Sequence, residues 1–373
     1  MKIDLVNLKK EYETIKEELK IAFEGVFERS DFIFGKDLAL FEEEFAKYCG
    51  TKYAIGVDSG TGALELALRA VEIKKGDEVI VPVFTFYATA ASVCYLSAKP
   101  VFVDVEENTG NIDVNRIEFI LKKNKKIKAI IPVHLFGQPA DMNSISTLLE
   151  KYNIKVIEDS AQAHGAKFKL SDGHWYRAGS VGICGCFSFY PAKNLGCYGD
   201  GGMVTTNDKS IADKIKLMRD YGRTEKYKHE SIGYNKRLDT LQAAILRIKL
   251  KYLDERNKKR REIAKQYIKL LEGLPVEPFD VKDDVEPVYH MFVVKVKKRN
   301  QLKEYLAKKG ISTGIHYPIP LHLQKSFSFL GYKKADFPTA EKLAEEVISL
   351  PMYPELQKEE IKYVCNSIKE FYR

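Results

Sequence analysis

Short apolar runs rich in β-branched residues recur between residues 53 and 206. Each run is too short for a helix, and most lack alternating polar positions, which is typical of strands covered on both faces. The seven runs are YAIGV (53–57), EVIVP (78–82), PVFVDV (100–105), KAIIPV (128–133), KVIED (155–159), CFSF (186–189) and GMVTT (202–206). The pattern therefore predicts a sheet of seven strands.

Stretches with helical spacing lie between these runs. They include residues 62–73, a segment within 85–96, and residues 141–152, where Asp141 stands in the position of an N-cap. Because strands alternate with helices, the sequence predicts an α/β fold with a doubly wound, mostly parallel sheet.

The pattern changes after residue 206. Helical spacing covers 208–221 and then 239–272, a segment long enough to connect two bodies of structure. Its charged stretch near 255–262 could bind nucleic acid, but a solvated helix face is the commoner explanation.

The remaining chain contains one strand-like run, at 291–296, and helical patterns near 299–309, 338–349 and 357–371. We expect three parts: an N-terminal segment (1–30) that packs with the small domain, a large ligand-binding domain (31–249), and a smaller C-terminal α+β domain (250–373).

Composition excludes a largely disordered or fibrous chain, because 45% of the 373 residues are hydrophobic and 30% are charged. Lys and Arg exceed Asp and Glu by 8, which favours an anionic small molecule without requiring nucleic acid, although solubility alone would explain it. The first residues include early acids and no continuous apolar stretch, so we expect neither a signal peptide nor a membrane anchor.

Six cysteines are scattered along the chain, mostly in apolar contexts, which predicts reduced thiols and a cytoplasmic location. Cys184 and Cys186 form a C-x-C pair, but no second Cys or His pair stands at zinc spacing. We interpret them as strand residues that share a face, and we expect no metal site.

Lys193 lies in the most informative segment, GCFSFYPAKNLGCYGDGG (185–202). The predicted strand ends near Ser188, Pro191 stops it, and a glycine-rich turn follows, so Lys193 is placed on a loop beside the sheet. Aromatic surroundings would lower the pKa of its amine and make the neutral form available for an imine. A solvated surface lysine remains the alternative.

Asp159 ends the apolar strand of the segment VIEDSAQAHG (156–165). Side chains at the carboxyl end of a parallel strand face the crevice in which α/β folds bind ligands. An acid there could act as a base, a metal ligand or a counter-ion to a bound cation. We prefer the counter-ion, because no cluster of His or acidic residues completes a metal site.

Gly60 and Thr61 lie where the predicted strand 53–57 runs through small residues into a helix. The N-terminus of a helix exposes backbone N–H groups and the positive end of the dipole, which suits a phosphate. The segment matches neither the Walker A motif nor the dinucleotide fingerprint. A simple capped turn remains the alternative.

The order of these segments resembles the fold type I enzymes that depend on pyridoxal 5′-phosphate (PLP). Within them, VIEDSAQAHGA and SFYPAKNLGCYGDGGMVTT resemble the sugar aminotransferases of the DegT/DnrJ/EryC1/StrS type. The similarity is close to full length and includes GDEVIVPVFTFYATA, IPVHLFGQPADM, GYNKRLDTLQAA and GISTGIHYPIPLHLQ. It implies the fold of a PLP-dependent aminotransferase with a seven-stranded, mostly parallel sheet.

The resemblance implies roles around the cofactor. Lys193 would hold PLP as a Schiff base and shuttle the proton, and Asp159 would pair with the pyridine nitrogen. Gln162 would approach the phenolic oxygen, and Phe86 would stack on the ring unless it is plain core packing.

The phosphate site would be built from Gly60, Thr61 and Ser188, and completed by Asn235 of a neighbouring subunit. The resemblance therefore implies a homodimer in which Asn235 crosses to the other active site. Candidate sugar contacts are Tyr190, His316 and Tyr317, and a structural role would explain each of them as well.

Because Lys193 is retained, the resemblance favours transamination over the dehydration carried out by relatives that have lost this lysine. We expect L-glutamate to convert PLP to pyridoxamine phosphate, which then aminates C3 of a dTDP-3-keto-6-deoxyhexose in deoxyamino-sugar biosynthesis. The alternatives are a C4 aminotransferase of a 4-keto nucleotide sugar and a non-catalytic protein that binds a nucleotide sugar or PLP. A nicotinamide-dependent enzyme is excluded, since no G-x-G-x-x-G follows an early strand.

Overall fold

A seven-stranded sheet forms the centre of the protein in a computed structural model that describes all residues, 1–373. Its strand order is β1-β9-β8-β5-β4-β2-β3, and only β9 runs antiparallel to its neighbours. The prediction of seven mostly parallel strands is confirmed. The strands are β1 (Tyr53–Val57), β2 (Glu78–Pro82), β3 (Lys99–Val103), β4 (Ile127–Ile130), β5 (Lys155–Asp159), β8 (Cys184–Ser188) and β9 (Gly202–Thr206).

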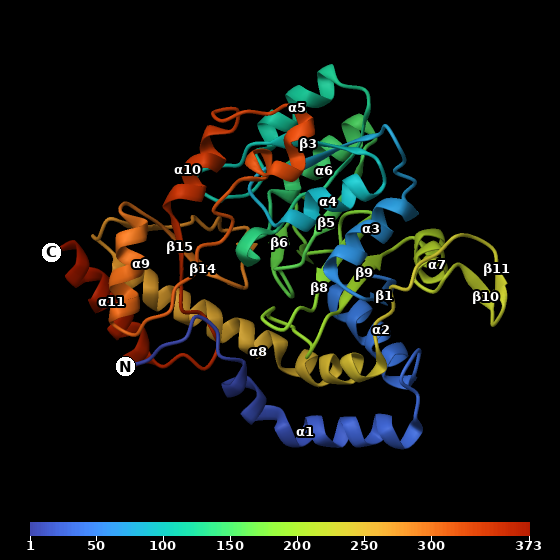
Figure 1. Cartoon of the computed structure of the whole chain (residues 1–373), viewed down its shortest axis with the longest axis horizontal. Helices are drawn as coiled ribbons and strands as arrows, with labels where there is room; N and C mark the ends of the chain where they lie inside the picture. The colour runs from blue at the N-terminus through green and yellow to red at the C-terminus, as the bar shows by residue number, and fades with distance from the viewer.

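Helices cover both faces of this sheet, as a doubly wound fold requires (Figure 1). Val79 and Val81 of β2 join the core under α3 and α4, whereas Ile80 joins the core under α5 and α6 on the opposite face. The helices of this part are α1 (Leu8–Arg29), α2 (Lys36–Cys49), α3 (Gly60–Ala70), α4 (Tyr87–Tyr95), α5 (Val114–Lys123), α6 (Met142–Tyr152) and α7 (Lys209–Met218).

Local signals account for several of these boundaries. The Asp141 side chain caps α6 by accepting a hydrogen bond from the backbone N–H of Ser144, as the sequence predicts. Cys184 and Cys186 are both buried in β8, on the same face of the strand. The helices α1 and α2, which lie ahead of the first strand, were not predicted.

A smaller sheet of three antiparallel strands, in the order β12-β14-β15, forms the second body. The elements of this part are α8 (Thr240–Leu271), β12 (Val276–Pro278), β14 (Phe292–Val296), α9 (Arg299–Lys308), α10 (Pro338–Glu346), β15 (Val347–Leu350) and α11 (Lys358–Tyr372). Both chain termini lie at this end of the molecule (Figure 1).

The prediction of one helix over 338–349 was wrong at its end. The helix α10 stops at Glu346, and Val347 begins β15, which pairs with β14. The four residues VISL are buried on both faces, and their β-branched side chains favour a strand once a partner strand is present. The sequence prediction of a single strand in this part therefore missed β12 and β15.

The remaining elements are short. They are η1 (Leu135–Gly137), β6 (Lys167–Lys169), β7 (Trp175–Arg177), β10 (Arg223–Glu225), β11 (Lys228–His229), β13 (Val285–Glu286), η2 (Leu321–Leu323) and η3 (Lys325–Leu330). The hairpin β10–β11 projects from the body beside α7 (Figure 1).

The long helix α8 belongs to both bodies. Ala243, Leu246 and Leu253 pack in one core with α2, and Ile263 and Tyr267 pack in the core of the small sheet. The expected boundary at residue 250 therefore falls inside a continuous helix, and the division into 1–30, 31–249 and 250–373 stays a proposal. No helix is both long enough and apolar enough to cross a membrane.

Candidate active site

A cavity of about 890 Å³ lies where the carboxyl ends of the large-sheet strands meet the small body. Ten of the eleven candidate residues line it, and they come from both bodies. These residues are Gly60, Thr61, Phe86, Asp159, Gln162, Ser188, Tyr190, Lys193, His316 and Tyr317. The strand ends and the loops after them thus bring together positions up to 257 residues apart in the sequence.

Lys193 lies on the loop that follows β8, where its backbone N–H donates to the carbonyl of Tyr190 at 2.8 Å. Burial lowers the pKa of its amine to about 8, and the nearby Asp159 carboxylate opposes this shift. The amine forms no hydrogen bond or ion pair within the chain. An unpaired amine with a lowered pKa is suited to act as a nucleophile.

Asp159 is buried at the carboxyl end of β5. Burial raises the pKa of its carboxyl group above the ordinary value, although hydrogen bonds from the Thr89 hydroxyl at 2.8 Å and the Ala161 N–H at 3.2 Å oppose this shift. A cation bound beside the carboxylate would offset the cost of its burial.

The N-terminus of α3 lies directly against the end of β8. A Cβ atom on Gly60 would come within 2.6 Å of the Cβ of Ser188, so this approach requires glycine. The side chain of Ser59 caps the helix by accepting from Gly62, and the first N–H groups of a helix have no acceptor within it. Backbone N–H groups, the Thr61 hydroxyl and the Ser188 hydroxyl therefore line one wall that suits an anion.

Gln162 connects two loops on the other wall. Its Oε1 accepts from the Phe136 N–H, and its Nε2 donates to the Tyr317 hydroxyl, both at 2.7 Å. Phe136 and Tyr317 stack with ring centroids 6.0 Å apart, and both have a positive φ, of 56° and 57°. A positive φ is costly for a bulky residue, so the surrounding packing must hold both aromatic residues in place.

The remaining candidates differ in exposure. Phe86 and Tyr190 each leave 57% of their surface exposed, so Phe86 is not plain core packing. The imidazole of His316 is within 2.7 Å of the Ser349 hydroxyl, and burial lowers its pKa to about 4.

Asn235 is exposed and does not line the cavity of its own chain. It lies beyond the projecting hairpin and forms a β-bridge with Asp220.

Several residues of the site were missed by the sequence analysis. Thr89 bonds Asp159, and His290 contacts the Asn194 side chain at 3.3 Å beneath the lysine loop. Leu5 and Val6 of the N-terminal segment line the cavity as well. A helical threonine and an isolated histidine carry no local signal, since only the tertiary structure places them beside a functional group.

The residues around the cavity fit PLP. The unpaired amine of Lys193 suits its aldehyde, the buried carboxylate of Asp159 suits a positively charged ring nitrogen, and the wall at Gly60 and Ser188 suits its phosphate. This donor set matches three chemically different ends of one cofactor.

Comparison with known proteins gives full-length relatives. A pleiotropic regulatory protein of Geobacillus stearothermophilus is 44% identical, with 100% of this chain and 99% of that protein covered. The dTDP-3-amino-3,6-dideoxy-alpha-D-galactopyranose transaminase of Aneurinibacillus thermoaerophilus is 44% identical (99% and 98% covered). The UDP-N-acetyl-3-dehydro-alpha-D-glucosamine 3-aminotransferase of Acidithiobacillus ferrooxidans is 42% identical (98% and 97% covered).

Solved structures agree with the fold. DesV of Streptomyces venezuelae, in complex with a ketimine intermediate, superposes with a TM-score of 0.95 at 39% identity and covers 100% of this chain and 99% of its own. NtdA of Bacillus subtilis, with bound pyridoxamine phosphate, gives a TM-score of 0.86 at 31% identity (98% and 82% covered).

The DegT/DnrJ/EryC1/StrS aminotransferase family matches residues 13–369. The family, the PLP-type fold and the cofactor class implied by the sequence are thereby confirmed. The chain belongs to the DegT/DnrJ/EryC1/StrS family of PLP-dependent aminotransferases.

Proposed function

We propose that this protein transfers an amino group from L-glutamate to C3 of a nucleotide-linked keto sugar, specifically a dTDP-3-keto-6-deoxyhexose. The observation that carries the proposal is the unpaired amine of Lys193 in the same cavity as the buried carboxylate of Asp159. Binding sites for PLP combine a lysine that forms a Schiff base with an acidic partner for the pyridinium nitrogen.

Each residue has a distinct task in this proposal. Lys193 would anchor the cofactor and would accept and return the proton at the substrate carbon, because its amine has a pKa of about 8. Asp159 holds the proton on the ring nitrogen. Gly60, Thr61 and Ser188 bind the phosphate, and Gln162 orients the phenolic oxygen. Bound PLP supplies the electron sink that makes the carbon acidic.

The names of two relatives support position 3 of the sugar as the site of amination. The transaminase of Aneurinibacillus thermoaerophilus and the aminotransferase of Acidithiobacillus ferrooxidans are both named for position 3 of the sugar, but one is named for a dTDP sugar and the other for a UDP sugar. Position 3 is therefore supported more strongly than the nucleotide. We propose Tyr190, His316 and Tyr317 as sugar contacts, because all three line the same cavity as Lys193.

We propose a homodimer in which Asn235 completes the phosphate site of the partner subunit. Asn235 is exposed and does not line the cavity of its own chain, which supports this assignment. The cytoplasmic location stays a prediction from the scattered cysteines.

Two alternatives remain. A C4 aminotransferase would use the same residues on a 4-keto sugar. A non-catalytic binding protein is favoured by the name of the Geobacillus relative, a pleiotropic regulatory protein. Binding alone does not require an unpaired amine at Lys193, so the catalytic function is preferred.

Product analysis separates these functions. The purified protein with PLP and L-glutamate is incubated with 3-keto and 4-keto nucleotide sugars, and NMR locates the new amine. We expect an amine at C3, borohydride fixation of PLP at Lys193, and no turnover by Lys193→Ala, whereas Lys209→Ala at the surface retains activity. An amine at C4 would establish the first alternative, and PLP binding without conversion by glutamate would establish the second.

A further inference from the structure

Two consecutive carboxylates end β5 and point to opposite faces of the sheet. Asp159 lines the cavity, whereas Glu158 does not and is fully buried. Side chains of adjacent strand residues alternate in direction, so this separation follows from the strand itself. Glu158 therefore has no direct contact with a ligand in the cavity and requires another explanation.

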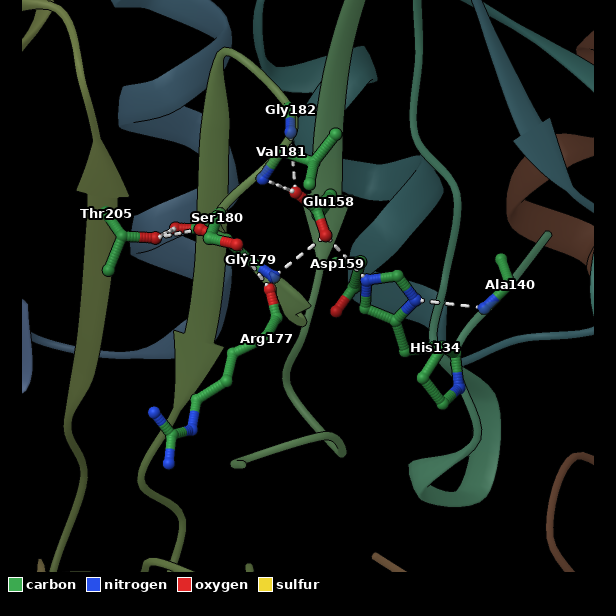
Figure 2. A network of polar contacts seen from close by, with 12 residues as sticks. His134, Ala140, Glu158, Asp159, Arg177, Gly179, Ser180, Val181, Gly182 and Thr205 are labelled. Atoms are coloured by element: carbon green, nitrogen blue, oxygen red, sulfur yellow. Dashed lines mark hydrogen bonds and ion pairs between the residues drawn. The ribbon is translucent and has the colours of Figure 1, made fainter. Parts of the chain in front are cut away.

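Four donors surround the Glu158 carboxylate (Figure 2). Its Oε2 accepts from His134 Nε2 at 2.9 Å and from the Gly179 N–H at 2.8 Å, and its Oε1 accepts from the Val181 and Gly182 N–H groups at 2.8 and 2.6 Å. Burial alone would raise the pKa of Glu158, but these hydrogen bonds outweigh burial and lower the pKa. A fully bonded carboxylate of this kind is a fixed cross-link.

His134 is held in one tautomer. Its Nδ1 accepts from the Ala140 N–H at 3.1 Å, so the ring proton is on Nε2 and is donated to Glu158 (Figure 2). The ring is completely buried. Both ring nitrogens are thus engaged in positioning rather than in catalysis.

The backbone around the carboxylate is shaped for close approach. A Cβ on Gly179 would lie 2.4 Å from the Phe187 ring, and a Cβ on Gly182 would lie 2.6 Å from the Val156 carbonyl oxygen. The Thr205 hydroxyl of β9 donates to the Gly179 carbonyl at 2.6 Å and fixes the turn from its other side.

The elements that the carboxylate joins carry the two ends of the proposed cofactor site. His134 follows β4, Glu158 lies in β5, and the turn 179–182 leads into β8. Asp159 pairs with Cys186 of β8, two residues before Ser188.

We propose that Glu158 is a positioning residue that fixes the spacing between Asp159, at the ring end of the cofactor, and Ser188, at the phosphate end. This inference rests on the proposed function, since it assumes that one cofactor bridges both residues. The cross-link acts through β5 and the turn 179–182, and not by contact with the cofactor.

Glu158→Gln tests this role, because the amide retains the shape of the side chain but turns an N–H donor toward backbone N–H groups. Full-length protein freed of PLP is titrated with PLP by visible absorbance, and inorganic phosphate is used as a competitor. PLP must reach both Asp159 and Ser188, so a change in their spacing should lower its affinity. Inorganic phosphate occupies only the end at Ser188, so its affinity should not change. We expect the dissociation constant of PLP to rise at least about tenfold, and the inhibition constant of phosphate to stay within about twofold.

Glu42→Gln is the matched control. Its carboxylate also accepts a backbone N–H, from Gly56 at 2.8 Å, and pairs with Arg219, but it does not line the cavity. We expect this variant to lower the melting temperature without changing the affinity for PLP. If Glu158→Gln does not fold, His134→Phe, which removes one of the four donors, is measured in the same way.

Three results would overturn the inference: unchanged PLP affinity in a folded Glu158→Gln protein, unchanged affinity in a folded His134→Phe protein when the first variant cannot be purified, or a loss of phosphate affinity equal to that of PLP. The last result would mean a general collapse of the site. If the wild-type protein itself failed to bind PLP, the proposed function would be wrong instead.

Discussion

The burial of Lys193 sets the pH at which its amine reacts. Only the neutral amine attacks an aldehyde. Because the pKa of the amine is about 8, the neutral fraction decreases as the pH is lowered below this value. We expect the rate of PLP uptake by the cofactor-free protein to rise about tenfold per pH unit up to about pH 8 and to level off above it. Stopped-flow measurement of the visible absorbance checks this profile.

Asp159→Asn tests the direction in which the pH profile of PLP uptake should shift. The Asp159 carboxylate raises the pKa of Lys193 against the effect of burial, so removing its charge should lower the pKa further. The level part of the profile should then begin at a lower pH. A rate that continues to rise to about pH 10, as for an exposed lysine, would contradict the burial of this amine.

The hydroxyl group of Thr89 helps to hold the carboxylate of Asp159 in position. Its Oγ1 donates to Asp159 Oδ2 at 2.8 Å, and both groups are buried. Thr89→Val keeps the shape but removes a hydrogen bond to a charged group, so we expect the affinity for PLP to fall about tenfold. Equilibrium titration measures the change.

Ser92→Ala is the control for Thr89, because Ser92 lies in the same helix and its buried hydroxyl donates to a backbone carbonyl, that of Thr89 itself. We expect it to leave PLP affinity within about twofold of the wild-type value. Equal losses in both variants would assign the effect to α4 as a whole rather than to the bond with Asp159.

At the scale of elements, strands separated from the neighbouring helices by turn residues were predictable, whereas a strand that directly continues a helical pattern was not. The run 155–159 has the β-branched pair Val156 and Ile157 at its centre, and the structure places β5 on the same residues. Val347–Leu350 continues a helical pattern, and only pairing with β14 makes it a strand. Local periodicity carries no information about that partner.

The residues of the site also fall into those that the sequence predicts and those that it does not. Lys193 and Asp159 could be found because Asp159 ends one recognisable strand and Lys193 follows another, both at the carboxyl edge of the sheet. Glu158 stands next to Asp159 in the sequence, but its role depends on His134 and on the turn 179–182, which only the fold brings to it. Residues that act through others are therefore harder to predict than residues that face a ligand.

The helix α8 supports the lysine loop from below. Asn257 Oδ1 accepts from the Asn194 side chain at 2.9 Å, and Asn257 Nδ2 donates to the His164 carbonyl at 2.8 Å, all in a buried region. Asn257→Ala leaves both partners without this bond, so we expect a loss of about 1–3 kcal/mol in the free energy of unfolding. Urea denaturation of the cofactor-free protein measures it.

Lys258→Ala, one position further along α8 on the exposed face, should change the free energy of unfolding by no more than about 0.5 kcal/mol. Ala is the best helix former, so helix propensity predicts no loss in either variant. A similar loss in both variants would therefore contradict a specific role for the buried amide network.

At the scale of the whole molecule, the cavity lies at the boundary between the two bodies. Elements that pack against both bodies hold them together. Ile3 forms an isolated β-bridge with Ile311 and packs in the core of the small sheet. Ile15 and Leu19 of α1 pack against α8. Figure 1 shows α1 running beside α8 along the lower edge of the molecule. Residues 5 and 6 thus reach the cavity from a segment anchored at both ends.

The proposed crossing of Asn235 gives a test that needs two different subunits. Lys193→Ala and Asn235→Ala protomers are each expected to form impaired dimers. In a mixed dimer, the Asn235→Ala protomer keeps its own Lys193 and receives Asn235 from its partner, so one site is intact. If both proteins are unfolded and refolded together in equal amounts, about a quarter of all sites should regain wild-type PLP affinity. If Asn235 instead serves its own chain, no intact site forms and mixing restores nothing, so the visible absorbance at limiting PLP distinguishes the two arrangements.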